Sequence, residues 1–229
     1  ERVSMASYLF FHPKPACDTY GDMNIYHDKF GNNEDPYVWS ERFLHSFCKI
    51  TDYAYSKSTQ KDIIFWISIN KEGNNLKYLC DLVFKIEKWD FWYKTFSEQK
   101  DAIATNKELT INDAVVEGDE EAYEYHYSWI NRGEHKWEPT YRRRRLTLKA
   151  DPVLSFQPQN RQGNLLDVTE LLKTIVNFNV EKSPAKSGTS YKAFELEEEQ
   201  ASKLYEEIKR LSFIRLKGRD LKNLRRNFS

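Results

Sequence analysis

The stretch that decides the fold is Lys61-Asp62-Ile63-Ile64-Phe65-Trp66-Ile67-Ser68-Ile69, then Asn70-Lys71-Glu72-Gly73-Asn74-Asn75, then Tyr78-Leu79-Cys80-Asp81-Leu82-Val83-Phe84-Lys85-Ile86-Glu87. The first run is β-branched and aromatic, which predicts a buried strand. The second run has the composition of a turn. The third run alternates apolar and polar residues over its last part, which predicts a second strand. Together the three runs predict a β-hairpin.

Further elements are predicted on both sides of this hairpin. Residues 6–11 form a strand that Pro13 and Pro15 end, because two prolines so close together exclude a helix. Residues 16–35 are rich in Gly, Asn and Asp and are predicted to be a long loop. The remaining predicted elements are a helix opened by Asp35-Pro36, strands over 123–129 and 142–148, and helices over 165–177 and 193–211.

These elements predict an α+β fold, with a small, mostly antiparallel sheet flanked by helices and a helical C-terminus. Strands and helices alternate too irregularly for a doubly wound parallel sheet. Ser, Pro and Gly over 183–189 predict a hinge. We therefore expect an α+β domain over 1–180, followed over 181–229 by this hinge and a C-terminal helical appendage with a basic tail.

Composition limits the compartment and the cofactors. The chain has three cysteines, Cys17, Cys48 and Cys80, an odd and widely spaced set that favours a reducing compartment and predicts no disulfide-linked partner. No apolar run approaches the roughly 18 residues of a transmembrane helix, so we expect a cytoplasmic protein without a membrane partner. The motifs GxxxxGK[ST], GxGxxG, CxxC and HExxH are absent, so we expect no cofactor and no metal.

Charge is balanced overall but segregated along the chain. The 35 basic and 35 acidic residues cancel. Residues 108–124 contain seven acidic residues and no basic one, whereas residues 132–149 contain seven basic and two acidic residues. A third block, 215–226, is again basic. Basic blocks attract phosphate backbones because Lys and Arg release condensed counterions on binding. The alternative is that the acidic and basic blocks pair with one another.

Aromatic rings are interleaved with the first basic block. A base stacked on a ring gains about 1–3 kcal/mol whatever its identity, and arginine adds phosphate contacts. Such residues together predict a ring-lined pocket with a basic rim that binds DNA or RNA. The alternative is an aromatic core beside a solvated arginine run. The candidate site residues are Trp66, Trp89, Trp92, Tyr125, Tyr127, Trp129, Arg132, Lys136, Trp137, Arg142, Arg143, Arg144 and Arg145.

The segment Lys61-Asp62-Ile63-Ile64-Phe65-Trp66, followed after a turn by residues 78–86, resembles a strand pair of the PUA-like barrels, the superfamily that includes the ASCH, EVE and YTH domains. The resemblance covers roughly 30 residues. It implies a PUA-like barrel with a pocket for a single base near Trp66, Trp89, Trp92, Tyr125 and Trp129. The catalytic Lys and Glu of ASCH-type amidohydrolases match no positions here, so that activity is not implied.

The sequence thus favours a nucleic-acid-binding module that captures an unpaired, flipped or modified base. A second hypothesis is a metal-dependent phosphodiesterase, because the polar loop 12–28 gathers the residues that metal-assisted hydrolysis uses. These are Asp18, Asp22, His27 and Asp28 around a divalent metal, with His12 or Lys14 assisting. A third is a protein-interaction domain that binds through its charged blocks. Whether the chain is an enzyme is left open.

Overall fold

A computed structural model describes residues 7–12, 15–20, 22–27, 45–46, 62–73, 75–91, 146–187 and 190–217, and the structural statements below concern these residues. The strands are β1 (Ser7–His12), β2 (Ala16–Tyr20), β3 (Met23–His27), β4 (His45–Ser46), β5 (Ile63–Glu72), β6 (Asn75–Phe91), β7 (Leu146–Ala150), β8 (Gln157–Gln159), β9 (Leu166–Asp167), β10 (Lys186–Ser187), β11 (Ser190–Tyr191), β12 (Phe194–Leu196) and β13 (Ile214–Leu216). The helices are α5 (Thr169–Ile175) and α6 (Glu198–Leu211).

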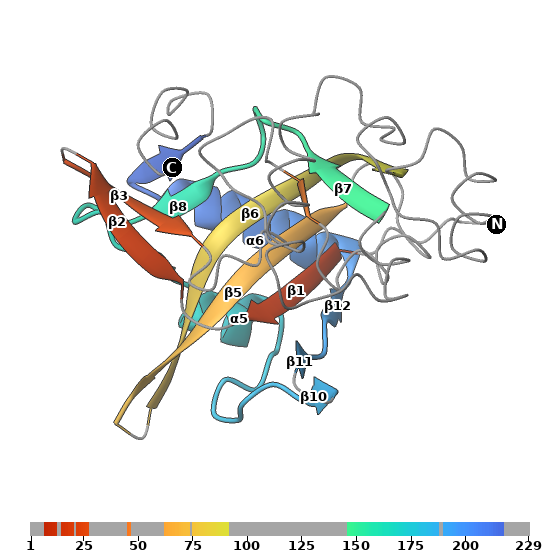
Figure 1. Cartoon of the computed structure of the whole chain (residues 1–229). Helices are drawn as coiled ribbons and strands as arrows, with labels where there is room; N and C mark the ends of the chain where they lie inside the picture. Colours follow the sequence, from red (N-terminus) through yellow and green to blue (C-terminus); the bar gives the residue numbers. More distant parts are fainter. Residues whose placement is uncertain are drawn as a thin grey trace, which may run out of the picture.

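The β5–β6 hairpin lies at the centre of the main sheet, which confirms the predicted hairpin (Figure 1). Phe65 of β5 lies across from Val83 of β6, and the pairing continues to Glu72 and Asn75 beside the turn. Gly73 in this turn has a φ of 62°, a left-handed conformation that glycine adopts without strain. Both strands are longer than predicted because the residues on either side of Gly73 still pair with each other.

The main sheet has the strand order β12-β1-β5-β6-β7-β4, and β9 pairs with β6 off this path. Strand β1 pairs parallel with β5 and antiparallel with β12. The other described pairings are antiparallel. The predicted α+β class with a mostly antiparallel sheet is therefore confirmed.

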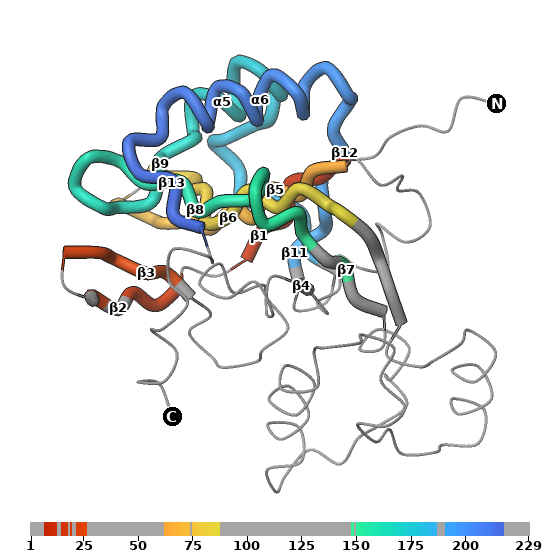
Figure 2. Tube along the Cα trace, turned by 90° about the horizontal axis from the view of Figure 1, so that it is seen from above, coloured from red at the N-terminus to blue at the C-terminus, as the bar shows by residue number. Residues whose placement is uncertain are grey.

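The two helices cover one face of the sheet. Figure 2 shows α5 and α6 next to each other on one side of the sheet and the β2–β3 hairpin on the other side. Leu9, Phe65 and Cys80 from the sheet share one buried cluster with Leu172 of α5 and Leu204 of α6. We call this side of the sheet the inner face. Because side chains alternate along a strand, the even-numbered residues of β1 and β5 lie on the opposite side, which we call the outer face.

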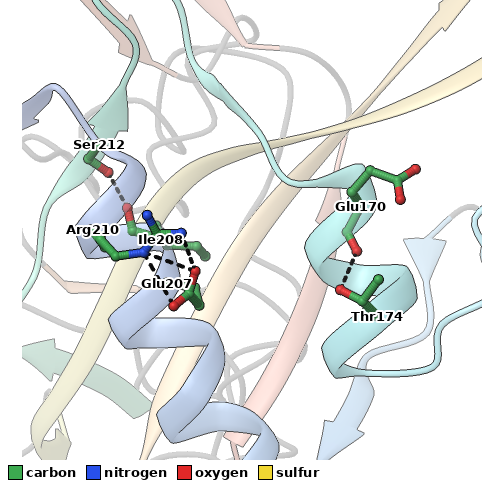
Figure 3. A network of polar contacts seen from close by, with 6 residues as sticks. All are labelled: Glu170, Thr174, Glu207, Ile208, Arg210 and Ser212. Carbon is green, nitrogen blue, oxygen red and sulfur yellow. Dashed lines mark hydrogen bonds and ion pairs between the residues drawn. The ribbon is translucent and has the colours of Figure 1, made fainter.

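Helix α6 follows the expected charge pattern of a helix. Glu197 and Gln200 form a capping box at its start, and Lys209 and Arg210 occupy its last turn, where the helix dipole favours positive charge. Arg210 Nη2 and Glu207 Oε2 form an ion pair of 2.7 Å one turn apart (Figure 3). Beyond the helix, Ser212 Oγ donates to the Ile208 carbonyl, which satisfies one of the last acceptors.

Four predicted elements differ from the structure. The helix predicted to open at Asp35-Pro36, with an apolar face that reaches Cys48, includes His45 and Ser46, which instead form β4 and pair with β7. The predicted loop over 16–35 contains the antiparallel hairpin β2–β3, in which Cys17 lies across from Tyr26. The helix predicted over 165–177 begins at Thr169, because Leu166 and Asp167 pair with β6 instead. The helix predicted over 193–211 begins at Glu198, because residues 194–196 pair with β1.

The C-terminal part of the described chain packs against the N-terminal part. Strand β12 forms one edge of the main sheet beside β1. Ala201, Leu204 and Ile208 of α6 lie in the same buried cluster as Leu9 of β1. The division into residues 1–180 and 181–229 stays a prediction about domains. Of the helices in the described ranges, none has the length and apolar character needed to cross a membrane.

Candidate functional site

Trp66 lies at the centre of the outer face, within the protein. Its side chain is only 1% exposed. The ring packs edge-on against Phe10 at 5.6 Å between ring centroids and against Phe84 at 5.3 Å. Among the described residues, its indole Nε1 is a buried donor with no hydrogen-bond partner. A buried donor left in this way costs about 1–3 kcal/mol.

A polar cluster lies next to Trp66 on the same face. Asp81 is buried, and its Oδ1 accepts a hydrogen bond of 2.8 Å from Ser68 Oγ. Its Oδ2 contacts Nε2 of His12 as an ion pair. The parallel pairing of β1 and β5 places His12 directly beside Ser68. The Asp81 carboxylate therefore contacts the imidazole of His12 on β1 and the hydroxyl of Ser68 on β5, which are neighbouring strands.

An irregularity in β6 explains how Asp81 reaches this position. Trp66 lies across from Leu82, whereas the next residue, Ile67, lies across from Cys80. Asp81 is thus the extra residue of a β-bulge, and it has no partner on β5. Bulges re-aim a side chain and are frequent next to functional sites. Here the bulge allows Asp81 to meet Ser68 on the outer face while Cys80 stays in the inner core.

The cluster was only partly visible in the sequence. His12 was predicted as a helper of a metal site, but its described partner is Asp81, which lies 69 positions further along the chain. In the sequence, Asp81 and Ser68 lie within the two predicted apolar strands, and no site role is predicted for them. The sequence held one signal of the cluster, the carboxylate of Asp81 within an otherwise apolar run. Because carboxylates are almost never fully buried unless they are paired, such a residue indicates a polar partner nearby.

The β2–β3 hairpin is attached to β8 by side-chain amides. Gln157, which is buried, accepts from the Tyr26 N–H through Oε1 and donates to the Tyr26 carbonyl through Nε2, both at 3.1 Å. Gln159 Nε2 donates to the Asn24 carbonyl at 2.7 Å. These amides replace a strand's main-chain pairing. Ile25, which is fully buried, is the apolar anchor among them.

Tyr26 connects this hairpin electrostatically to the polar cluster. Burial raises the pKa of Tyr26 to about 12, and Cys17 and the charge of Asp81 act in the same direction. Cys17 is exposed and lies across from Tyr26 in the hairpin. The pKa of Tyr26 on β3 therefore responds to Cys17 on β2 and to Asp81 on β6.

The other residues of the predicted metal site are described only in part. Asp18 lies across from Ile25, and His27 lies across from Ala16 at the open end of the hairpin. Within the described ranges no group of three or more His, Cys, Asp and Glu residues is placed to hold a metal ion. Asp28 and Lys14 lie outside the described residues.

The predicted aromatic and basic residues are described only in part. Trp89 belongs to β6, where its backbone lies across from Leu148 of β7. Two residue pairs further along, Phe91 lies across from Leu146. The other predicted residues lie outside the described ranges: Trp92, Tyr125, Tyr127, Trp129, Arg132, Lys136, Trp137, Arg142, Arg143, Arg144 and Arg145.

The chain was compared with protein-family models, curated proteins and solved structures, and nothing in any of the three matches it.

Proposed function

We propose that this protein is a nucleic-acid-binding module that captures an unpaired, flipped or modified base of DNA or RNA. The observation that carries the proposal is the register between β6 and β7. Phe91, near the end of β6, lies across from Leu146 at the start of β7. In the sequence, Trp92 directly follows the first of these residues and Arg145 directly precedes the second. Strand pairing thus brings together Phe91 and Leu146, which in the sequence adjoin an aromatic segment and the basic run 142–145.

The chemistry of the two segments is complementary for a nucleic acid. Four consecutive arginines provide charge for successive phosphates, and binding them releases counterions. Trp89, Phe91, Trp92 and Tyr93 give the 89–93 segment four rings, and a base can stack on any aromatic ring.

Trp66 takes a different place in this proposal. Its ring is buried, so in this conformation it does not offer a face to a base. Among the described residues its indole N–H has no hydrogen-bond partner, and a donor of this kind could bind an acceptor on the edge of a base if the pocket opened. The role of Trp66 in a base-binding pocket stays a prediction.

The test measures binding of fluorescent single-stranded and double-stranded DNA and RNA over a salt series. The variant is Arg143→Ala with Arg144→Ala, and the control is Lys209→Ala with Arg210→Ala on α6, which removes the same charge elsewhere. We expect saturable binding by the wild type. In the arginine variant we expect affinity to fall for all sequences and the slope of log K against log salt to decrease by about 1–2.

The control should keep the wild-type slope, because its residues lie at the exposed end of a helix. Equal slopes in wild type and arginine variant would remove the run 142–145 from the binding surface. Absence of binding to every oligonucleotide at low salt would overturn the proposed function as a whole.

A further inference from the structure

An exposed aromatic ring lies at the start of the C-terminal strand β13. Phe213 directly precedes this strand, and its N–H donates to the Gln159 carbonyl of β8 at 2.9 Å. Figure 2 shows β13 beside β8. The Phe213 side chain is 62% exposed, the largest fraction among the large hydrophobic residues that the structure describes. The pair of strands thus holds this ring in solvent.

A guanidinium lies over the same ring. The Arg161 Cζ atom is 5.0 Å from the centroid of the Phe213 ring. Arg161 belongs to a tight turn in which the Gly163 N–H donates to the Asn160 carbonyl at 3.1 Å. Asn160 Oδ1 accepts from two further main-chain N–H groups of this turn. These hydrogen bonds fix the backbone on both sides of Arg161 and so position its side chain near the ring.

Arg215 adds a second guanidinium on the same side of β13. Because successive side chains of a strand alternate between its faces, Phe213 and Arg215 share one face and lie about 6.4–6.8 Å apart along the strand. Both side chains are exposed, whereas Leu216 is buried, as this alternation requires. Burial raises the pKa of Tyr205 on α6 and the charge of Arg215 lowers it, so Arg215 lies on the side of α6.

Neither of these guanidiniums is paired with a carboxylate. Within the described ranges Arg161 and Arg215 form no ion pair, whereas Arg210 at the end of α6 pairs with Glu207 at 2.7 Å. Asp151 lies in the same region, but its carboxylate accepts hydrogen bonds from two main-chain N–H groups. The charges of the two arginines are therefore available to an anion from outside the chain.

We propose that Phe213, Arg161 and Arg215 form a second nucleic-acid-binding surface, on which a single strand of DNA or RNA stacks one base and places the adjoining phosphates. The proposal goes beyond the site at the end of β6 and β7, because it uses none of the residues of that site. It shares with that site only the class of ligand.

The chemistry of the surface favours a nucleic acid over a peptide. Each nucleotide combines a flat face that stacks on a ring with a phosphate that binds arginine. An acidic peptide would account for the two arginines but not for the exposed ring, and an apolar peptide would account only for the ring. In a duplex both faces of a base are covered by its neighbours, so the surface selects single strands. Every base has such a face, so we expect no base preference.

The experiment measures binding of a fluorescent single-stranded oligonucleotide and of its duplex to the full chain over a salt series. In Phe213→Ala we expect a loss of affinity of about 5–100-fold for the single strand, with unchanged duplex binding and an unchanged salt slope. In Arg161→Gln with Arg215→Gln the slope should decrease by about 1.4, which is about 0.7 for each phosphate contact. A general fold defect would not separate affinity from slope in this way.

Two further variants and a crosslink locate the effect. Phe194→Ala removes another exposed ring, on β12, and should keep the wild-type affinity. Phe213→Trp keeps an aromatic face and should retain binding. A strand that contains 5-iodouracil, crosslinked by light and followed by trypsin digestion, should label the peptide 211–215, which contains Phe213. Thermal unfolding checks that each variant is folded at the assay temperature.

Each outcome decides between the two nucleic-acid proposals. Binding that falls in Arg143→Ala with Arg144→Ala but not in Phe213→Ala would overturn this inference and leave the proposed function intact. The reverse result would support this surface and remove the run 142–145. A loss in the Arg161 and Arg215 variant alone, with equal binding of polyglutamate and DNA, would assign the surface to acidic proteins and overturn base stacking. No binding of any oligonucleotide by the wild type would overturn both.

Discussion

The two faces of the central strands bury different kinds of side chain, although they share one backbone. The inner face carries apolar side chains such as Leu9, Phe65 and Val83, all fully buried against α5 and α6. The outer face of the same strands buries Trp66 together with Ser68 and Asp81. Burial alone therefore does not separate structure from function in this protein. The difference lies in whether the buried groups need polar partners.

The inner face gains its stability mainly from packing. Dispersion and the hydrophobic effect act without direction, so many apolar residues would serve there. On the outer face each polar group requires a partner in a defined place. A face with buried polar groups is therefore less stable for its size than an apolar face. Polar residues that are buried there despite this cost indicate a role beyond packing in the core.

The largest effect is expected on the inner face, from Phe65→Ala. The side chain is fully buried at the centre of the helix-covered core. Its removal should lower the free energy of unfolding by about 3–5 kcal/mol, because transfer and cavity terms add. Urea unfolding followed by circular dichroism measures this change. A loss below about 1 kcal/mol would mean that α5 and α6 do not pack tightly on the sheet.

The next effect concerns the outer face. Asp81→Ala removes the shared acceptor of Ser68 and His12. We expect a loss of about 1–3 kcal/mol, because the buried Ser68 hydroxyl is left unsatisfied. Adding Ser68→Ala should restore part of this stability, since it removes that orphan donor. Such a recovery has no equivalent on the inner face, where a second truncation only enlarges the cavity. Purely additive losses would show that the two residues do not form one polar unit.

The comparison also explains what the sequence could predict. The β5–β6 hairpin followed from a β-branched run, a turn with Gly73 and an alternating run, all of which are local signals. The position of Asp81 depends on a bulge between Trp66 and Ile67, and no local pattern specifies where an extra residue enters a strand pair. The partner of His12 comes from the parallel pairing of β1 with β5 and from β6 beyond it, which is a long-range feature.

The same limit applies to the β2–β3 hairpin. Residues 16–27 lack the apolar alternation of a buried strand, so the sequence favoured a loop. Side-chain amides of Gln157 and Gln159 stabilise this hairpin from a distant segment. Tertiary contacts thus override a weak local preference, as they often do for strands.

The smallest effect is expected from Tyr8 of β1, on the outer face. Burial raises the pKa of Tyr8 from 10.0 to about 12, and the charges of Glu195 and Asp62 act in the same direction. The folded protein therefore keeps this phenol neutral at a pH where the unfolded chain ionises it. Stability from this group is complete below pH 10 and is lost as the pH rises toward 12.

Urea unfolding at pH 9 and pH 11 of the wild type and of Tyr8→Phe isolates this contribution. At pH 11 the wild type should lose at most about 1.4 kcal/mol through Tyr8, because one pKa unit is worth that much. The decline between the two pH values should be correspondingly smaller in Tyr8→Phe. An identical decline in both proteins would mean that Tyr8 ionises as readily in the folded state as in the unfolded chain. The outer face around Tyr8 would then be open to water. The contrast between the two faces would be confined to the part of the strands around Trp66.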